Sequence, residues 1–285
     1  MPLSATFGNL IARLRGASPS ASGASGASVS SITDRDEYQT FCERASTDDA
    51  VFSKFRRAPV LVDVLEHVTR DQGAAYLDAI VRDNADLLTD PNRFHANDTL
   101  GSPLLFEYGL TGRVSPVTLR YLKVVSDLRR LFGDLSGLDI VEIGVGYGGQ
   151  CRLVTQYWPV GSYTLIDLAP ALGLARRFLN GLGTEAQLRF EPPDEVQPRR
   201  YDLCISNYAF SELGRPVQQA YAEAVVSRSE RGYMTCNFVS DLFKIESMSH
   251  EELLSLHAGT RWEKEEPLTH PKNSILVWGT QSSGA

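Results

Sequence analysis

Two hydrophobic patterns alternate through the middle of the chain. Apolar runs of strand length lie at residues 138–143, 162–166, 187–190, 201–206 and 233–239. Segments with apolar side chains at helical spacing lie between them, at residues 150–157, 170–181 and 216–225. Short apolar runs predict buried strands, and their alternation with helices predicts a mainly parallel sheet that is covered on both faces.

The end of the chain follows a different pattern. Ser249 is followed three residues later by Glu252, a capping box that predicts a helix as far as His257. Residues 260–265 and 274–280 are β-prone and flank a Pro-bounded loop that holds His270. They predict an antiparallel hairpin at the sheet edge, so that the fold is α/β with a Rossmann-like seven-stranded sheet.

Helical patterns also precede the sheet. Ser115 is a natural N-cap and Pro116 a natural first residue for a helix that ends near Phe132. Three further helical patterns fill residues 33–88, the first capped by Thr33 or Asp34. Pro59 opens the second, whose shared face consists of Leu61, Val64, Leu65 and Val68. We expect these three helices to form a bundle over the ligand site.

Residues 92–114 contain much Gly, Pro, Asn and Asp, which argues against regular structure. A long polar loop beside a site is often a lid, and a solvated connector is the alternative. Residues 1–32 are predicted to be disordered, because residues 17–31 are almost wholly Ala, Ser and Gly. The chain therefore divides into this segment, a helical cap with a lid loop at 33–114, and a sheet domain at 115–285.

Composition narrows the choice of partner. The 285 residues carry a net charge of -7, which argues against a nucleic-acid partner, and no stretch approaches the length of a membrane span. The four cysteines, at positions 42, 151, 204 and 236, are widely spaced. They predict buried core residues in a reducing cytoplasm, with neither disulfides nor a metal pattern.

The candidate chemistry centres on the turn after the first strand. Gly144, Gly146 and Gly149 satisfy G-x-G-x-x-G, in which glycine lets the backbone approach a ligand closely. Asp167 closes the next strand, where a carboxylate would accept hydrogen bonds from the ribose hydroxyls of a bound nucleotide. Both nicotinamide and S-adenosylmethionine (SAM) enzymes use these features. Glu142 favours SAM, because it can face an amino-acid ammonium group that NAD lacks.

The chain resembles the class I SAM-dependent methyltransferases, and more narrowly the sugar O-methyltransferase family. The resemblance covers roughly residues 97–279. Its motifs here are Asn97-Asp98 with Gly101 and Pro103, Ser115-Pro116 with Thr118-Leu119-Arg120-Tyr121, the segment 142–150, and the segment 205–213. Val145 is a departure, since that family usually has a third consecutive glycine at this position.

The resemblance implies SAM as the cofactor and a sugar-like small molecule as the methyl acceptor. The residues predicted to bind the cofactor are Arg120, Glu142, Gly144, Gly146, Tyr147, Gly148, Gln150, Asp167, Leu168, Glu191, Asn207 and Tyr208. The signal for Glu191 as an adenine contact is weak, and Asp194 is its rival. The oligomeric state is open, with a homodimer among the options.

Methyl transfer to a hydroxyl also needs a base that takes the acceptor's proton. Glu212 is the first candidate, because it closely follows the fourth strand, where many small-molecule O-methyltransferases have a His-Asp pair. His270 and His95 are the rivals. No metal site is predicted, although Asp98, Glu212, Asp241 and His270 offer ligands if the chain brings them together.

Three other functions stay open. One is methylation of a different acceptor, such as a peptide carboxylate or a polyketide hydroxyl. The second is a nicotinamide-dependent oxidoreductase, and the third is a SAM-fold module that binds without catalysis.

Overall fold

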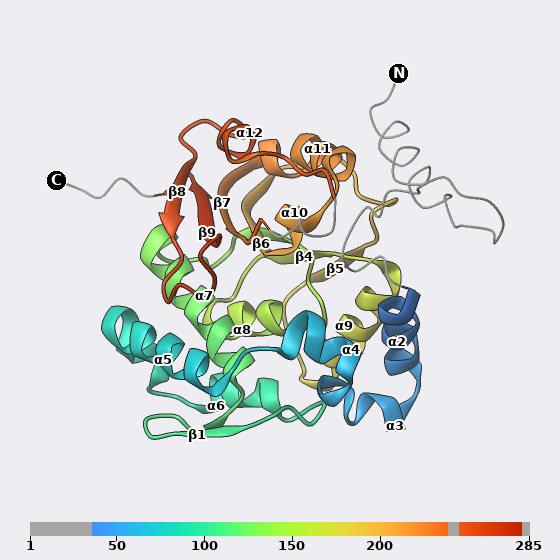
Figure 1. The fold of residues 1–285 in the computed structure, drawn as a ribbon, viewed down its shortest axis with the longest axis vertical. Helices are drawn as coiled ribbons and strands as arrows, with labels where there is room; N and C mark the ends of the chain where they lie inside the picture. The colour runs from blue at the N-terminus through green and yellow to red at the C-terminus, as the bar shows by residue number, and fades with distance from the viewer. Residues whose placement is uncertain (1–35, 239–244, 281–285) are drawn as a thin grey trace.

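A seven-stranded sheet forms the centre of the computed structural model, which describes residues 36–238 and 245–280 (Figure 1). Its strands are β3 (Asp139–Ile143), β4 (Ser162–Ile166), β5 (Leu188–Glu191), β6 (Tyr201–Asn207), β7 (Ser229–Cys236), β8 (Arg261–Lys264) and β9 (Ser274–Trp278). The order is β5-β4-β3-β6-β7-β9-β8. Strands β3 to β7 run parallel, and β9 is antiparallel to both β7 and β8. The predicted Rossmann-like sheet with a terminal hairpin is confirmed.

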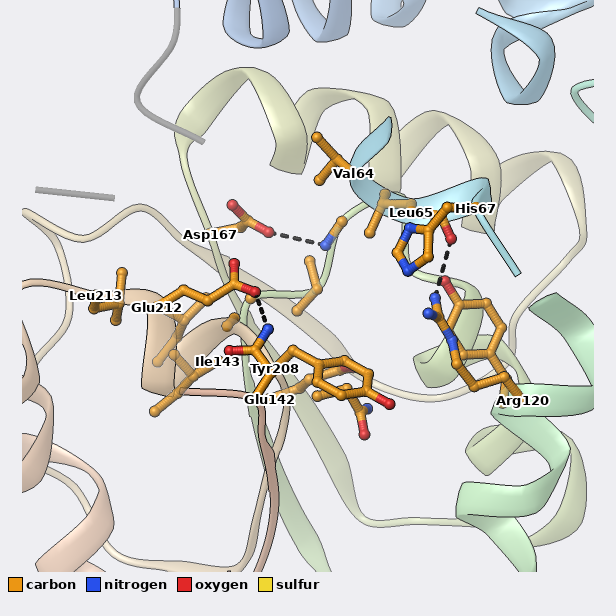
Figure 2. A pocket seen from close by; sticks show the side chains of 18 of the residues that line it. Val64, Leu65, His67, Arg120, Glu142, Ile143, Asp167, Tyr208, Glu212 and Leu213 are labelled. Atoms are coloured by element: carbon orange, nitrogen blue, oxygen red, sulfur yellow. Dashed lines mark hydrogen bonds between the residues drawn. The ribbon is translucent and has the colours of Figure 1, made fainter. Parts of the chain in front are cut away.

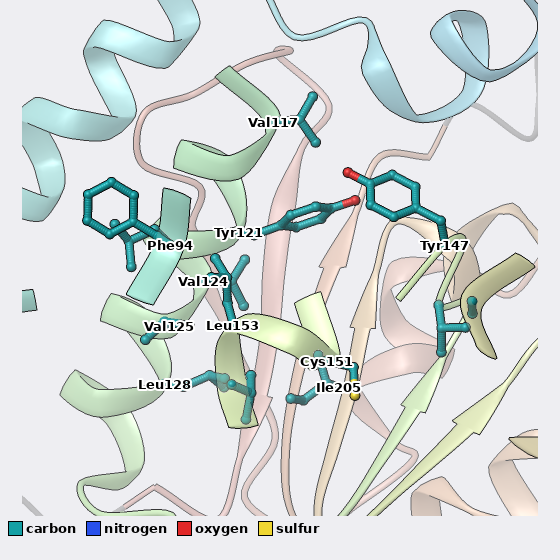
Figure 3. Packing of buried hydrophobic residues seen from close by; sticks show 14 of the residues in the cluster. Phe94, Val117, Tyr121, Val124, Val125, Leu128, Tyr147, Cys151, Leu153 and Ile205 are labelled. Atoms are coloured by element: carbon teal, nitrogen blue, oxygen red, sulfur yellow. The ribbon is translucent and has the colours of Figure 1, made fainter. Parts of the chain in front are cut away.

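Helices cover both faces of this sheet because the central strands are apolar on both sides. They are α7 (Pro116–Phe132), α8 (Gly149–Tyr157), α9 (Ala169–Gly181), α10 (Ala209–Glu212), α11 (Arg215–Ala224) and α12 (His250–Leu254). In β3, Ile140 belongs to the core cluster that contains α7, α8 and α9, whereas its neighbour Val141 belongs to the cluster that contains α11. Figure 3 shows part of the first cluster, with Leu128 of α7, Leu153 of α8 and Ile205 of β6.

Residues 36–114 form short elements: α2 (Asp36–Thr47), α3 (Asp49–Phe52), η1 (Phe55–Arg57), α4 (Pro59–Leu61), η2 (Val62–Glu66), α5 (Arg70–Asn84), η3 (Ala85–Leu88), α6 (Asn92–His95), η4 (Ala96–Asp98), β1 (Phe106–Tyr108) and β2 (Gly112–Val114). The predicted N-terminal helices are present, but within the described residues they do not pack chiefly on one another as the expected bundle. Instead α2 packs on α9 and α5 packs on α7 (Figure 1), so these helices share one core with the sheet domain.

Two further expectations for this region need correction. The helix opened by Pro59 is α-helical only to Leu61 and continues as a π-helical turn to Glu66. The segment 92–114 was expected to lack regular structure, yet it contains α6 and the β1–β2 hairpin. The predicted disordered segment 1–32, the caps Thr33 and Asp34, and Val239 and Asp241 lie outside the described residues.

A buried arginine holds this region against the sheet domain. Arg56 is 1% exposed and donates to Glu66 Oε1 at 2.7 Å, to Asp98 Oδ1 at 3.0 Å and to Ser115 Oγ at 3.2 Å. Asn97 donates from Nδ2 to the carbonyl of Gly149 at 2.9 Å. Buried charges with several partners define one geometry, so these contacts form a clamp, centred on Arg56, that holds the start of the segment 92–114 on the sheet domain.

The four cysteines are free and buried, as expected of core residues. No helix in the described ranges is long and apolar enough to cross a bilayer.

Candidate active site

A cavity of about 450 Å³ opens outside the carboxyl ends of β3, β4 and β6, which is where ligands bind in open α/β sheets (Figure 2). Predicted site residues that line it are Arg120, Glu142, Gly144, Gly146, Asp167, Leu168, Asn207, Tyr208, Glu212 and His270. The volume falls within the usual range for small-molecule sites. The structure thus gathers residues that lie up to 150 positions apart in the chain, from Arg120 to His270.

The glycine turn forms the floor of the cavity and leaves no room for side chains. Gly144 and Gly146 have φ angles of 79° and 54°. A Cβ atom on Gly144 would lie 2.0 Å from the Cβ of Ala209, and one on Gly146 would lie 2.8 Å from Cδ1 of Leu65. Val145 is buried in the core between them, so the departure from the family pattern does not obstruct the turn.

Asp167 fixes this turn from the neighbouring strand. Its Oδ2 accepts from the backbone N–H of Gly146 at 2.9 Å, and its Oδ1 accepts from that of Leu168 at 2.7 Å. Burial raises the pKa of Asp167 to about 6, although these backbone donors oppose the shift. The carboxylate therefore lies directly after β4, in the lining of the cavity.

Glu142 and Asn207 lie at the ends of the neighbouring strands β3 and β6. Glu142 is 2% exposed and accepts a hydrogen bond from the Tyr163 hydroxyl at 2.8 Å. Burial raises the pKa of Glu142 to about 8, and no Lys or Arg opposes the shift among the described residues. The amide nitrogen and oxygen of Asn207 are both buried without a hydrogen-bond partner in the described structure. Such groups indicate a place for a polar, cationic ligand.

A stability measurement checks the state of Glu142. Its pKa is about 8 in the folded protein, against about 4.3 in an unfolded chain. Because the folded state holds the proton more tightly, the free energy of unfolding decreases as pH rises through this window. In the ligand-free protein, we expect wild type to lose about 2 kcal/mol more than Glu142→Gln between about pH 6 and pH 8.

Urea unfolding at the two pH values measures this difference. Glu223→Gln is the control, because that carboxylate is exposed on α11 and should leave the pH dependence unchanged. If the free energy of unfolding decreases equally with pH in wild type and Glu142→Gln, Glu142 is not protonated in the folded protein near pH 6.

Glu212 is the last residue of the short helix α10. This helix follows Tyr208, a strained residue whose φ is 67°. Its Oε1 accepts a hydrogen bond from Nδ2 of Asn237 (Figure 2). Burial raises the pKa of Glu212 to about 6, and the Asn237 amide opposes the shift. A carboxylate with this pKa is mostly ionised near neutral pH and still basic enough to accept a proton.

The two histidine candidates lie in different places. His270 lines the cavity from the β8–β9 loop, and its Nδ1 accepts from the backbone N–H of Lys272 at 3.2 Å. The ring of His95 instead lies against Phe94, and its Nε2 is 2.8 Å from the carbonyl oxygen of Thr111. The structure therefore does not bring His95 to the cavity, and we withdraw it as a candidate base.

Four predicted cofactor contacts do not line the cavity. The Tyr147 hydroxyl donates to Glu66, and Gly148 packs against Leu179. Gln150 donates from Nε2 to the carbonyl of Tyr121. These three residues therefore contact other parts of the protein and do not reach the cavity. Glu191 pairs with Arg199 at 2.7 Å, and Pro193 lines the cavity after β5 in its place.

Sequence reasoning missed several lining residues, namely Tyr38, His67, Gln72, Tyr76, Pro193, Tyr221, Thr269 and Asn273. Tyr38 and Tyr76 lie within segments of helical pattern, which could not show that these side chains face the cavity. His67 is exposed at the mouth of the cavity. Partial burial of its ring, and then the positive charge of Arg120, lower its pKa to about 4. No local pattern marked it.

The metal alternative gains no support from the described residues, which contain no group of three or more His, Cys, Asp or Glu that could hold an ion. Asp98 is bound to Arg56 and lies outside the cavity lining.

Comparison with known proteins adds one relative. No family model matches the chain. Over 109 residues it is 36% identical to a malonyl-[acyl-carrier protein] O-methyltransferase of Acetivibrio thermocellus, a match that spans 35% of this chain and 38% of that protein's length.

Similar solved structures include a mutant of MtNAS in complex with S-adenosylmethionine, at 13% identity and a TM-score of 0.45 over 96% of each chain. Another is magnesium protoporphyrin IX methyltransferase from Synechocystis PCC 6803, at 17% identity and a TM-score of 0.43 over 55% of this chain and 80% of that one. The sheet order itself defines the fold: this chain has the Rossmann-like, seven-stranded fold of class I methyltransferases.

Proposed function

We propose that this protein binds SAM and transfers its methyl group to an oxygen of a small molecule. The charge of the cavity carries the proposal. Glu142, Asp167 and Glu212 all line it, burial raises the pKa of each, and no cation among the described residues lowers these values. A bound cation would relieve this cost, and SAM carries both an ammonium and a sulfonium charge.

The same charges disfavour a nicotinamide cofactor. Its pyrophosphate is anionic and requires basic groups or free backbone N–H groups, whereas Arg120 is the sole Lys or Arg among the described lining residues. The N–H of Gly146, at the centre of the turn, already donates to Asp167.

The lining residues fit SAM part by part. Asp167 would accept hydrogen bonds from the ribose hydroxyls, and Glu142 would bind the ammonium group. Asn207 offers buried amide atoms that have no hydrogen-bond partner in the described part of the chain. Leu168 and Pro193 supply an apolar end for the adenine. When bound, SAM supplies an electrophilic methyl group on a positively charged sulfur.

The protein's own contribution to the reaction is positioning and proton removal. Holding the acceptor in line with the methyl group supplies much of the rate of such a reaction. Glu212 is the base that we assign, because it lines the cavity as a carboxylate and its pKa is about 6. His270 lines the same cavity and is its rival.

We propose a sugar hydroxyl as the acceptor, on the strength of the family resemblance. A carboxylate is the second candidate, because the similar segment in Acetivibrio thermocellus belongs to a malonyl-[acyl-carrier protein] O-methyltransferase. The free, buried cysteines are compatible with a reducing cytoplasm.

A thermal shift experiment tests the cofactor. SAM and S-adenosylhomocysteine should raise the melting temperature, because a ligand that binds only the native state stabilises it by mass action. NAD and NADP at the same concentrations should not. Stabilisation by NAD or NADP without any by SAM would contradict the proposal.

A mass assay then separates an enzyme from a binding module. Incubation with SAM and a panel of sugars and carboxylic acids should yield a product that is heavier by one methylene unit. Stabilisation by SAM without transfer to any acceptor in the panel would favour the module.

A further inference from the structure

Arg120 is a cation at the wall of the cavity, and it has no anionic partner among the residues that the structure describes. It lies near the N-terminal end of α7, one turn after Pro116, is partly buried, and lines the cavity. Its Nη2 donates to the carbonyl oxygen of Leu65 at 3.1 Å, which is its one hydrogen bond to the described residues (Figure 2). The remaining guanidinium donors therefore have no acceptor within residues 36–238 and 245–280.

Aromatic rings surround this guanidinium. Its Cζ lies 5.5 Å from the ring centroid of Tyr121 and 5.9 Å from that of Tyr208. Such rings hold a guanidinium in place and leave its N–H groups free for another acceptor. Arg120 also acts on His67, whose pKa it helps to lower, so its charge reaches the cavity mouth.

The nearby carboxylates are already engaged. Glu265, beyond Tyr208, accepts from the Tyr208 hydroxyl at 2.6 Å, the Thr269 N–H at 2.7 Å and Asn273 Nδ2 at 3.1 Å. Glu66 is bound to Arg56. Arg120 forms no ion pair within the described structure; burial disfavours its charge and acts to lower its pKa, and nearby tyrosines oppose this effect.

We propose that Arg120 is the binding site for a ligand carboxylate. A guanidinium presents a planar fork that matches a carboxylate, and a charge-assisted pair in a partly desolvated site is strong and selective. The proposal rests on the proposed function and deepens it. Two ligands could bring the carboxylate: SAM, through its methionyl end, or the acceptor.

The methionyl end is the source that the structure favours. Glu142, which suits an ammonium group, and Arg120, which suits a carboxylate, line the same cavity beside the glycine turn. A bound ammonium group would favour the ionised form of Glu142, and the pair would then match the two ends of an amino-acid zwitterion.

Calorimetric titration with SAM and decarboxylated SAM tests this assignment. Wild type should bind SAM at least about tenfold more tightly than decarboxylated SAM, the difference expected from one charge-assisted interaction. In Arg120→Gln the ratio of the affinities for SAM and decarboxylated SAM should be close to one. The glutamine amide can still donate a hydrogen bond to the carbonyl of Leu65. Arg113→Gln is the control, because Arg113 is exposed on β2 and should keep the wild-type ratio.

A second titration distinguishes the source. Malonate and malonamide are titrated into wild type and Arg120→Gln with S-adenosylhomocysteine bound. The site would belong to the acceptor if wild type binds malonate but not malonamide and Arg120→Gln loses malonate binding. In that case Arg120→Gln would also keep the wild-type ratio of affinities for SAM and decarboxylated SAM. If Arg120→Gln does not fold by circular dichroism, Arg120→Lys keeps the charge without the fork and should give an intermediate ratio.

Equal weakening of SAM and decarboxylated SAM would show a structural role and overturn the assignment. An unchanged SAM ratio without malonate binding would also overturn it. Failure of wild type to bind SAM or S-adenosylhomocysteine at all would overturn the proposed function, and the assignment with it.

Discussion

Replacing Glu212 with glutamine should lower turnover by about 10²- to 10⁴-fold, the usual contribution of a general base. Glutamine keeps the shape of the side chain and its contact with Asn237 but cannot accept the acceptor's proton. The affinity for SAM should change little. The measurement is the rate of S-adenosylhomocysteine formation with the acceptor that the mass assay identifies, beside a direct SAM titration.

The pH profile gives a second readout of the same residue. The pKa of Glu212 is raised to about 6, and the active form is the ionised one, so turnover should rise through pH 6 and level off above it. Glu212→Gln should lose this rise. A profile that keeps it would assign the titration to another group.

His270→Asn is the matched comparison, since both residues line the cavity. His270→Asn should lower turnover much less than Glu212→Gln does. The reverse ranking would transfer the role of base to His270. A large loss of SAM affinity in Glu212→Gln would instead mean that Glu212 binds the cofactor or holds the structure.

Replacing Asp167 with alanine should weaken SAM binding by about 10²-fold or more, because two hydrogen bonds from ribose hydroxyls to a charged acceptor are lost. Calorimetric titration measures the change. Asp78→Ala is the control, since Asp78 lies on the exposed side of α5 and should leave SAM affinity unchanged.

Asp167 also holds the glycine turn, so the unfolding free energy must be measured as well. Its folded pKa of about 6 exceeds the usual value for an aspartate, which means that the buried charge is a cost near neutral pH. Removing it offsets the lost backbone hydrogen bonds. A large fall in the stability of the ligand-free protein would indicate that Asp167 is chiefly structural.

The sheet and its turns could be predicted because their signals are local. The run at 162–166 became β4 with the same bounds, and the capping box of Ser249 and Glu252 is present. The glycine turn and Asp167 were found for the same reason, since they follow strands at fixed places. A parallel sheet then brings the ends of those strands together.

The rest of the site depends on contacts between distant segments. Nothing within residues 62–68 shows that Leu65 covers Gly146 or that His67 lies near Arg120. The segment 92–114 looked irregular because its order comes from partners elsewhere, such as Gly149 for Asn97. The sequence pattern also could not show that the carboxylate of Glu191 would form an ion pair with Arg199.

The Arg56 clamp bears on how this protein could be recombined with relatives. A crossover at residue 115 looks natural, because the helix before the sheet starts there. It would, however, separate Arg56 from Ser115, Asn97 from Gly149 and Leu65 from Gly146. A chimera with an N-terminal half from a relative would keep the glycine turn but lose the contacts of Arg56, Asn97 and Leu65 that hold and cover it. The N-terminal half and the glycine turn therefore have to come from the same parent protein.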